Sequence, residues 1–189
     1  MQKKRTEPTV FINPVPLVMV SCGDERGRSS IITVGWGGGL CADPPFVGIA
    51  VRRDRYSHGI ITDAGEYAVN LPSRELLAAV DYCGTISGRD RDKFADTGLN
   101  PQPAGELDWT ALIHECPVNL ECRVEEVLRL GTHDFFVARV VASHVRETWT
   151  DDRGRIRAPS EELLAYCTGT YLSMGEELGS RGRSFGPGA

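Results

Sequence analysis

Short apolar runs separated by polar turns recur along the first part of the chain. The runs 15–22, 29–36, 46–51 and 67–71 contain many β-branched and aromatic residues, and turn-forming Gly, Pro and Asp lie between them. Runs of this length and composition predict β-strands. The polar segment 23–28 joins the first two runs, which are therefore predicted to form a hairpin.

Two longer segments, 118–129 and 134–145, alternate between apolar and polar positions. A period of two is typical of strands with one buried face. Because Gly131-Thr132-His133 forms a turn between them, the pair is predicted to be a long antiparallel hairpin. A final strand or extended segment is predicted over 163–172, after a charged loop at 150–162 to which no role is assigned.

Three short helices are predicted between these strands. One covers 57–64, a second begins after Ser73 as its N-cap residue, and a third covers 90–96. The buried face of the second helix is expected to consist of Leu76, Leu77 and Val80. Strands and helices do not alternate regularly, which disfavours a doubly wound parallel sheet. A closed or partly open antiparallel barrel with helical insertions fits better.

Charge and hydropathy narrow the classes of partner. The 189 residues include 21 Lys and Arg against 26 Asp and Glu, which gives a net charge of −5 with neutral histidines. Nucleic acids and anionic membranes require clustered positive charge, so neither partner is expected. No segment approaches the roughly 20 apolar residues that span a bilayer. The basic N-terminus is not followed by an apolar stretch of signal-peptide length, and we expect a soluble cytoplasmic protein.

The cysteines and histidines show no metal-binding pattern. The six cysteines lack C-x-x-C spacing, and the four histidines are scattered. We therefore expect reduced thiols and no metal, although an even number of cysteines also permits a disulfide framework. The G-x-G-x-x-G, P-loop, G-x-S-x-G and H-E-x-x-H motifs are absent as well.

Two cationic segments stand out in this acidic chain. Arg52-Arg53-Asp54-Arg55-Tyr56-Ser57 lies between a predicted strand and a predicted helix, and Ser87-Gly88-Arg89-Asp90-Arg91-Asp92-Lys93 leads into another helix. Cationic side chains, serine hydroxyls and the amides of a helix N-terminus are donors that hold a phosphate. The alternatives are a solvated charged turn for the first segment and an ordinary helix cap at Ser87 or Asp90 for the second.

A third feature is Trp36 within the glycine-rich segment 35–39. Glycine allows the backbone to approach a flat cofactor closely, and tryptophan offers a surface for stacking. The alternative is a core tryptophan at a barrel rim, with the glycines permitting strand curvature. The residues alone support both interpretations equally.

Together these stretches resemble the flavin reductase-like family, and most closely its flavoredoxin-type members. The resemblance covers about residues 10 to 182, in order. It rests on 13–16 (NPVP), 30–36 (SIITVGW), 43–45 (DPP), 51–57 (VRRDRYS), 66–71 (EYAVNL), 81–84 (DYCG), 87–90 (SGRD), 92–94 (DKF), 116–122 (CPVNLEC), 131–133 (GTH) and 171–175 (YLSMG).

This resemblance implies a mainly β fold, namely an antiparallel, Greek-key-like, FMN-binding split β-barrel with short helical insertions. One such domain would occupy residues 1–189, with a core at about 10–182 and flexible ends at 1–9 and 183–189. Members are usually homodimers that bind FMN near the subunit interface.

The resemblance also implies the residues of the site. The phosphate would be held by Arg52 and Ser57. His133 stands where reductases of this superfamily often place a histidine near the nicotinamide of NAD(P)H, with an ordinary turn histidine as the alternative. The isoalloxazine ring would be lined by the backbone of Thr33, Val34, Gly35, Trp36 and Gly37. The phosphate and ribityl side would be completed by Ser87, Gly88 and Lys93, and Tyr171 would approach the flavin from the C-terminal segment.

The implied function is redox chemistry at the flavin. One possibility is an NAD(P)H-dependent reductase of FMN, free flavin or ferric complexes. The alternative is a flavoredoxin-like electron carrier that receives electrons from a protein donor. A split-barrel protein that binds FMN without turnover is a third possibility, and the sequence names neither the electron donor nor the acceptor.

Overall fold

The computed structural model describes residues 1–175 and 178–179. The tail beyond Gly175, including the end predicted to be flexible at 183–189, lies almost entirely outside them. No described helix is long and apolar enough to cross a membrane.

The strands are β1 (Val15–Pro16), β2 (Val18–Gly23), β3 (Ser29–Val34), β4 (Gly37–Ala42), β5 (Pro45–Arg52), β6 (Glu66–Leu71), β7 (Pro101–Gln102), β8 (Leu112–Ile113), β9 (Val118–Leu130), β10 (His133–Val145), β11 (Leu164–Cys167) and β12 (Thr170–Ser173). The helices are α1 (Tyr56–Ala64), α2 (Leu77–Thr85) and α3 (Lys93–Thr97), with single 3₁₀ turns η1 (Arg74–Leu76), η2 (Glu147–Trp149) and η3 (Ser160–Glu162).

Seven strands form one antiparallel sheet in the order β3-β2-β6-β9-β10-β5-β4. Its two edge strands, β3 and β4, are consecutive in the chain, and only Gly35 and Trp36 join them. This short link brings the two edges together at one end, so the sheet curls into a barrel that stays split further along. The predicted mainly β, antiparallel split barrel is therefore confirmed, as is the long hairpin, which is formed by β9 and β10.

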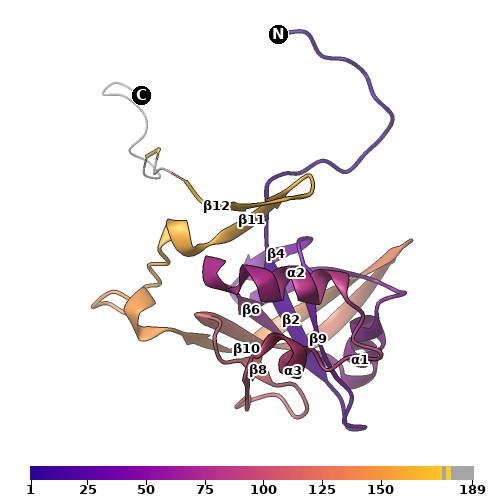
Figure 1. Ribbon diagram of the computed structural model, residues 1–189, viewed down its shortest axis with the longest axis vertical. Coiled ribbons are helices and arrows are strands. Elements are labelled where there is room, and N and C mark those ends of the chain that lie inside the picture. The colour runs from indigo at the N-terminus through magenta and orange to yellow at the C-terminus, as the bar shows by residue number, and fades with distance from the viewer. Residues whose placement is uncertain (176–177, 180–189) are drawn as a thin grey trace.

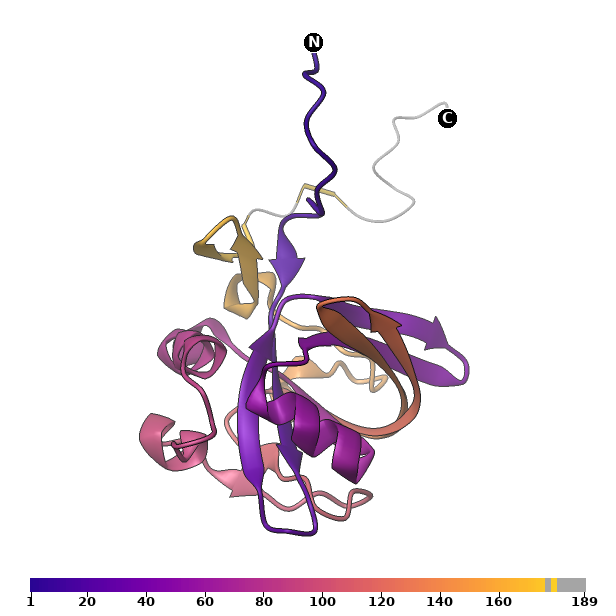
Figure 2. The same cartoon turned by 90° about the vertical axis from the view of Figure 1, so that its right-hand side faces the viewer.

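Helix α1 contributes to the core of the barrel. Its residues Ile60 and Ile61 are fully buried against the aliphatic side chains of the strands. The helix ends at Gly65, whose left-handed conformation (φ 68°) suits a residue without a Cβ. The helix predicted over 57–64 is confirmed to within one residue. Figure 2 shows it in purple, lying in front of the curled sheet.

A separate three-stranded sheet has the order β1-β11-β12. The prediction of one strand over 15–22 is wrong in this respect, because β1 pairs with β11 whereas β2 joins the barrel. The segment predicted as a final strand over 163–172 is a hairpin that turns at Gly169 (φ 89°). In Figure 1 this small sheet lies above α2, at the end from which the N-terminal segment leads away.

Three further details differ from expectation. The helix predicted over 90–96 begins only at Lys93, because the carboxylate of Asp92 caps it by accepting from the N–H groups of Phe94 and Ala95. The glycines at 37–39 do not end the strand region but form β4, which pairs with β5. Leu77 was expected to be buried but is 38% exposed, because the 3₁₀ turn η1 precedes α2 and changes which side chains face the core. Val80 is fully buried, as predicted.

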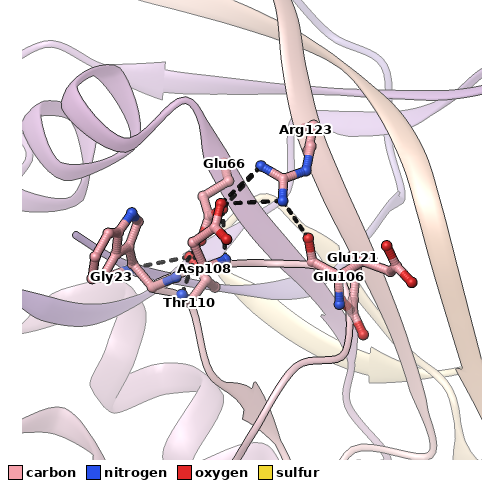
Figure 3. Close-up of polar contacts among 8 residues, drawn as sticks. Gly23, Glu66, Glu106, Asp108, Thr110, Glu121 and Arg123 are labelled. Atoms are coloured by element: carbon pink, nitrogen blue, oxygen red, sulfur yellow. Dashed lines mark hydrogen bonds and ion pairs between the residues drawn. The ribbon is translucent and has the colours of Figure 1, made fainter. Parts of the chain in front are cut away.

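A buried carboxylate anchors the loop that precedes β8 to the barrel (Figure 3). Glu66 on β6 is 1% exposed and accepts hydrogen bonds from the backbone N–H groups of Asp108, Trp109 and Thr110 at 2.9–3.0 Å. Arg123 on β9 lies 3.7 Å from the same carboxylate. The polar side of β6 is thereby buried without leaving unpaired charge.

Glu121 on β9 plays a similar part. Its carboxylate accepts hydrogen bonds from the N–H groups of Gly105 and Glu106, and it lies 2.7 Å from Nε2 of His144. Burial opposes ionisation of Glu121, but these donors outweigh it and hold its pKa below the usual value. The first half of β9 is therefore buried on both faces, although its sequence alternates.

Two turns share the pattern Asp-x-Arg-Gly-Arg, at 24–28 and at 151–155. In each, Oδ1 of the aspartate accepts hydrogen bonds from the N–H groups of the third and fifth residues, and Oδ2 accepts one from Nε of the last arginine. The glycines have φ values of 74° and 71°. The second turn orders part of the charged loop to which the sequence assigned no role.

Candidate functional site

Most of the residues predicted to surround the isoalloxazine ring line one hollow of 370 Å³. It is called the larger hollow, to distinguish it from an adjoining hollow of 120 Å³ described below. The larger hollow lies where the link between β3 and β4 meets the end of β5 and the start of β10, with the small sheet forming another wall. The predicted site residues that line it are Thr33, Val34, Gly35, Trp36, Arg52, His133 and Tyr171.

Trp36 and His133 form one wall of the larger hollow. Their ring centroids are 4.9 Å apart and their planes are inclined at 40°. Trp36 is 49% exposed. Nδ1 of His133 lies 2.9 Å from Oγ1 of Thr132, and no described residue pairs with Nε2. This wall therefore offers an exposed aromatic surface and an imidazole ring with one nitrogen that has no partner among the described residues.

Tyr171, from β12, forms another part of the wall. Its hydroxyl donates a hydrogen bond to Oδ1 of Asp81 at 2.7 Å, which ties the small sheet to α2. The ring of Tyr166 packs edge-on against the ring of Tyr171, with the ring centroids 5.5 Å apart. Burial raises the pKa of Tyr171 to about 12, and the neighbouring carboxylate acts in the same direction. Tyr171 is therefore a neutral hydrogen-bond donor at physiological pH.

A second, smaller hollow of 120 Å³ adjoins the first, and Ile32, Arg55 and Gly84 line both. The smaller hollow lies between the N-terminus of α1 and the segment that follows α2. It brings together the predicted phosphate-side residues Ser57, Ser87, Gly88 and Lys93. The two cationic segments of the sequence therefore face one another.

Lys93 is a buried cation of the smaller hollow. It is 4% exposed, and its ammonium donates hydrogen bonds to the carbonyl oxygens of Ile31 at 2.7 Å and Cys83 at 2.8 Å. Burial lowers its pKa. Both partners of this ammonium are backbone carbonyl oxygens, and no Asp or Glu among the described residues forms an ion pair with it. A buried charge without a counter-ion is unfavourable, so the hollow favours an anion.

The floor near Lys93 holds further hydroxyl groups. Ser57 is buried. The nearby Cys22 thiol donates to the carbonyl oxygen of Ser30, and burial raises its pKa to about 12. Oγ of Ser30 is buried and has no partner among the described residues. A Cβ at Gly88 would lie 2.2 Å from this oxygen, so only glycine fits here. The loop after α2 can therefore lie close to β3.

Arg52, which was predicted to hold the phosphate, and the nearby Arg55 are placed differently around the two hollows. The guanidinium of Arg52 pairs with Asp54 at 2.8 Å and lines only the larger hollow. Arg55 lines both hollows at the N-terminus of α1, and it forms no ion pair with a described residue. Sequence reasoning did not single out Arg55, although its place immediately before the predicted helix was a usable signal.

Gly37 lies apart from the other predicted ring-side residues. It begins β4 and lines a different, apolar hollow of 200 Å³ together with Val18 and Leu120. A Cβ at Gly37 would lie 2.8 Å from the carbonyl oxygen of Gly48, so this glycine allows β4 to pack closely on β5. Strand geometry thus accounts for Gly37, whereas Gly35 and Trp36 do line the larger hollow.

The family of the chain and its fold emerge from comparisons with known proteins. Residues 11–175 match the family model described as flavin reductase like domain, and the chain belongs to this family.

Three named proteins are similar to this chain over most of its length. Flavoredoxin of Desulfovibrio vulgaris (Miyazaki F) is 27% identical, with 97% of this chain and 99% of that chain covered and a TM-score of 0.85. An FMN-binding protein from Thermus thermophilus is 25% identical, with coverages of 95% and 99% and a TM-score of 0.80. NADH:riboflavin 5'-phosphate oxidoreductase of Streptomyces pristinaespiralis is 27% identical over 67% of this chain and 68% of that protein.

Proposed function

We propose that this protein binds FMN, with the isoalloxazine ring in the larger hollow and the phosphate in the smaller one. The observation that carries the proposal is the buried ammonium of Lys93, which has no described carboxylate partner and lines the same hollow as Arg55. A phosphate would provide the missing negative charge. The similarity to an FMN-binding protein supports the choice of ligand.

The residues present fit a phosphate group. No side chain caps α1, and the N–H of His58 donates to the carbonyl oxygen of Arg55, so the N–H groups of Tyr56 and Ser57 are available to an anion. Ser57 and Ser87 add hydroxyl groups in the same hollow. Because the two hollows share lining residues, one elongated ligand can occupy both.

A bound flavin would supply hydride acceptance and electron transfer, and the protein would supply placement and electrostatics. Gly35 has no side chain, so the backbone at Gly35 and Trp36 can approach a flat ring closely. Backbone N–H groups directed at the ring would stabilise the negative charge of its reduced form and raise its reduction potential.

We propose further that the protein is an oxidoreductase in which NAD(P)H reduces the flavin, with free flavin or ferric complexes as acceptors. His133 would order the nicotinamide beside Trp36, since its Nε2 has no partner among the described residues. The similarity to an NADH:riboflavin 5'-phosphate oxidoreductase supports this activity.

A flavoredoxin-like electron carrier is the second candidate, and the similarity to a flavoredoxin supports it. Anaerobic addition of NADH or NADPH to the FMN-loaded protein separates the two. Rapid bleaching of the visible flavin band is the result expected of the reductase. No bleaching by either nicotinamide, together with reduction by a protein donor such as ferredoxin, would identify the carrier instead.

We also propose that one domain covers the chain and that it acts as a homodimer in the cytoplasm, with the flavin near the interface. Large apolar side chains remain exposed around the larger hollow and on the nearby strands, namely Trp36, Leu40, Leu128 and Leu130. A second copy would remove them from water. Sedimentation of the FMN-loaded protein should give the mass of a dimer, and a monomeric mass at working concentrations would reject this assembly.

A further inference from the structure

We propose that Asp134 is a positioning residue of the phosphate site, an inference that rests on the proposed function. Its carboxylate is on β10 and is 6% exposed. Oδ1 accepts a hydrogen bond from Nε of Arg53 at 2.8 Å and forms an ion pair with its Nη2 at 2.7 Å. Oδ2 lies 2.9 Å from Nε2 of His58, which donates to it. One buried carboxylate therefore holds two cationic or polar side chains.

These two side chains bracket the segment that lines the smaller hollow. Arg53 immediately follows β5, and His58 lies in the first turn of α1. All four residues between them, 54–57, line the smaller hollow. Asp134 consequently ties both ends of this cradle segment to the same point on β10.

Other contacts also hold the two ends of the cradle segment, Arg53 and His58, against β10 and the turn before it. The backbone N–H of Arg53 donates to the carbonyl oxygen of Thr132 at 3.4 Å, and the ring of His58 packs edge-on against Phe136 at 5.3 Å. Arg53, His58 and Asp134 line neither hollow. Asp134 therefore acts on a bound phosphate through the cradle segment and not by contact.

The effect of this clamp is to prepare the cradle before the ligand arrives. A free turn would lose conformational entropy on binding, and holding it in the bound arrangement reduces that cost. Asp134 also carries a negative charge close to a site for an anion, which by itself weakens phosphate binding. Positioning and charge therefore predict opposite results when the carboxylate is removed.

The test measures dissociation constants of the apoprotein for FMN and for riboflavin, which lacks the phosphate. Asp134→Ala should weaken FMN binding about tenfold and change riboflavin binding by less than about twofold. The matched control is Asp63→Ala, which removes an equal charge from the last turn of α1, where Asp63 pairs with Arg28. This control should leave the ratio of the two affinities unchanged.

Two results would overturn the proposal. One is FMN affinity in Asp134→Ala that is unchanged or stronger, as charge alone predicts. The other is an equal loss for FMN and riboflavin, which indicates a general structural role. If Asp134→Ala does not fold by circular dichroism, Arg53→Met and His58→Phe each leave the carboxylate one partner. Each should then show a smaller, FMN-selective loss, and the absence of selectivity in both would reject the clamp.

Failure of the proposed function gives a different result. Wild-type protein that binds neither FMN nor riboflavin would reject the flavin site itself. Wild-type protein that binds FMN more tightly than riboflavin retains that site, and the variants at Asp134, Arg53 and His58 then decide the role of the clamp.

Discussion

The rings of Trp36 and His133 lie with their centroids 4.9 Å apart, although Trp36 joins β3 to β4 and His133 begins β10. The contact arises because β5 pairs with β4 on one side and with β10 on the other. These pairings bring the link after β3 and the turn before β10 to the same end of the barrel. They create the exposed wall beside which we place the flavin ring.

His133→Ala should leave the dissociation constant for FMN within about twofold of the wild-type value. It should slow flavin reduction by NADH or NADPH about tenfold or more, because a nicotinamide that is no longer oriented transfers hydride more slowly. Stopped-flow absorbance under anaerobic conditions measures this rate. His114→Ala is the control, since His114 lies outside both hollows and pairs with Gln102. Equal reduction rates in the His133 variant and the wild type would remove His133 from the mechanism.

Arg55→Ala should weaken FMN binding more than Arg52→Ala does. Arg55 lines both hollows and has no ion-pair partner among the described residues, whereas Arg52 already pairs with Asp54. Loss of a charge-assisted hydrogen bond corresponds to about ten- to a hundredfold in affinity. Calorimetric titration of the two variants side by side measures the order. The reverse order would return the phosphate to Arg52.

Glu66→Ala should lower the free energy of unfolding by about 2–4 kcal/mol, because three backbone N–H groups lose their buried acceptor. Urea denaturation followed by circular dichroism measures the change. Glu106→Ala is the control, since only the backbone of Glu106 takes part in these contacts, and it should change stability by less than about 0.5 kcal/mol. Similar losses in both variants would contradict the anchoring role of Glu66.

The turn at 151–155 should loosen only in strong acid. Hydrogen bonds from Arg155 lower the pKa of Asp151 to about 2, against an ordinary value of 3.8. The carboxylate therefore stabilises the turn fully above pH 3.8, and this contribution is lost as the pH falls through about 2. Carbon-detected NMR titration of Asp151 should show this low pKa, with the amide signals of Arg153 and Arg155 following it. A midpoint near the ordinary value would contradict the structure.

Much of the barrel was predictable from sequence because its strands are short apolar runs between turn residues. The single strand predicted over 15–22 failed because nothing local shows that Val15–Pro16 pairs with β11 near the other end of the chain. β4 was missed for a related reason. Its three glycines have low strand propensity, and only pairing with β5 makes them a strand.

The site residues were predictable only where the resemblance to the family assigned a role to an individual position. Lys93 was included on that basis, but its two carbonyl acceptors and missing counter-ion emerge only in three dimensions. The clamp joins Asp134 to Arg53, which lies 81 positions earlier in the sequence, and to His58, which lies 76 positions earlier. No local sequence pattern indicates such a contact, because it depends on how distant strands pair in the folded chain.

The central claim is that a phosphate occupies the smaller hollow beside Lys93, and the most direct measurement compares FMN with riboflavin. Calorimetry on wild-type apoprotein should give FMN binding about ten- to a hundredfold tighter than riboflavin binding. In Lys93→Met the two affinities should approach one another, because FMN loses its buried counter-ion. Equal affinities for FMN and riboflavin in the wild type would contradict the account.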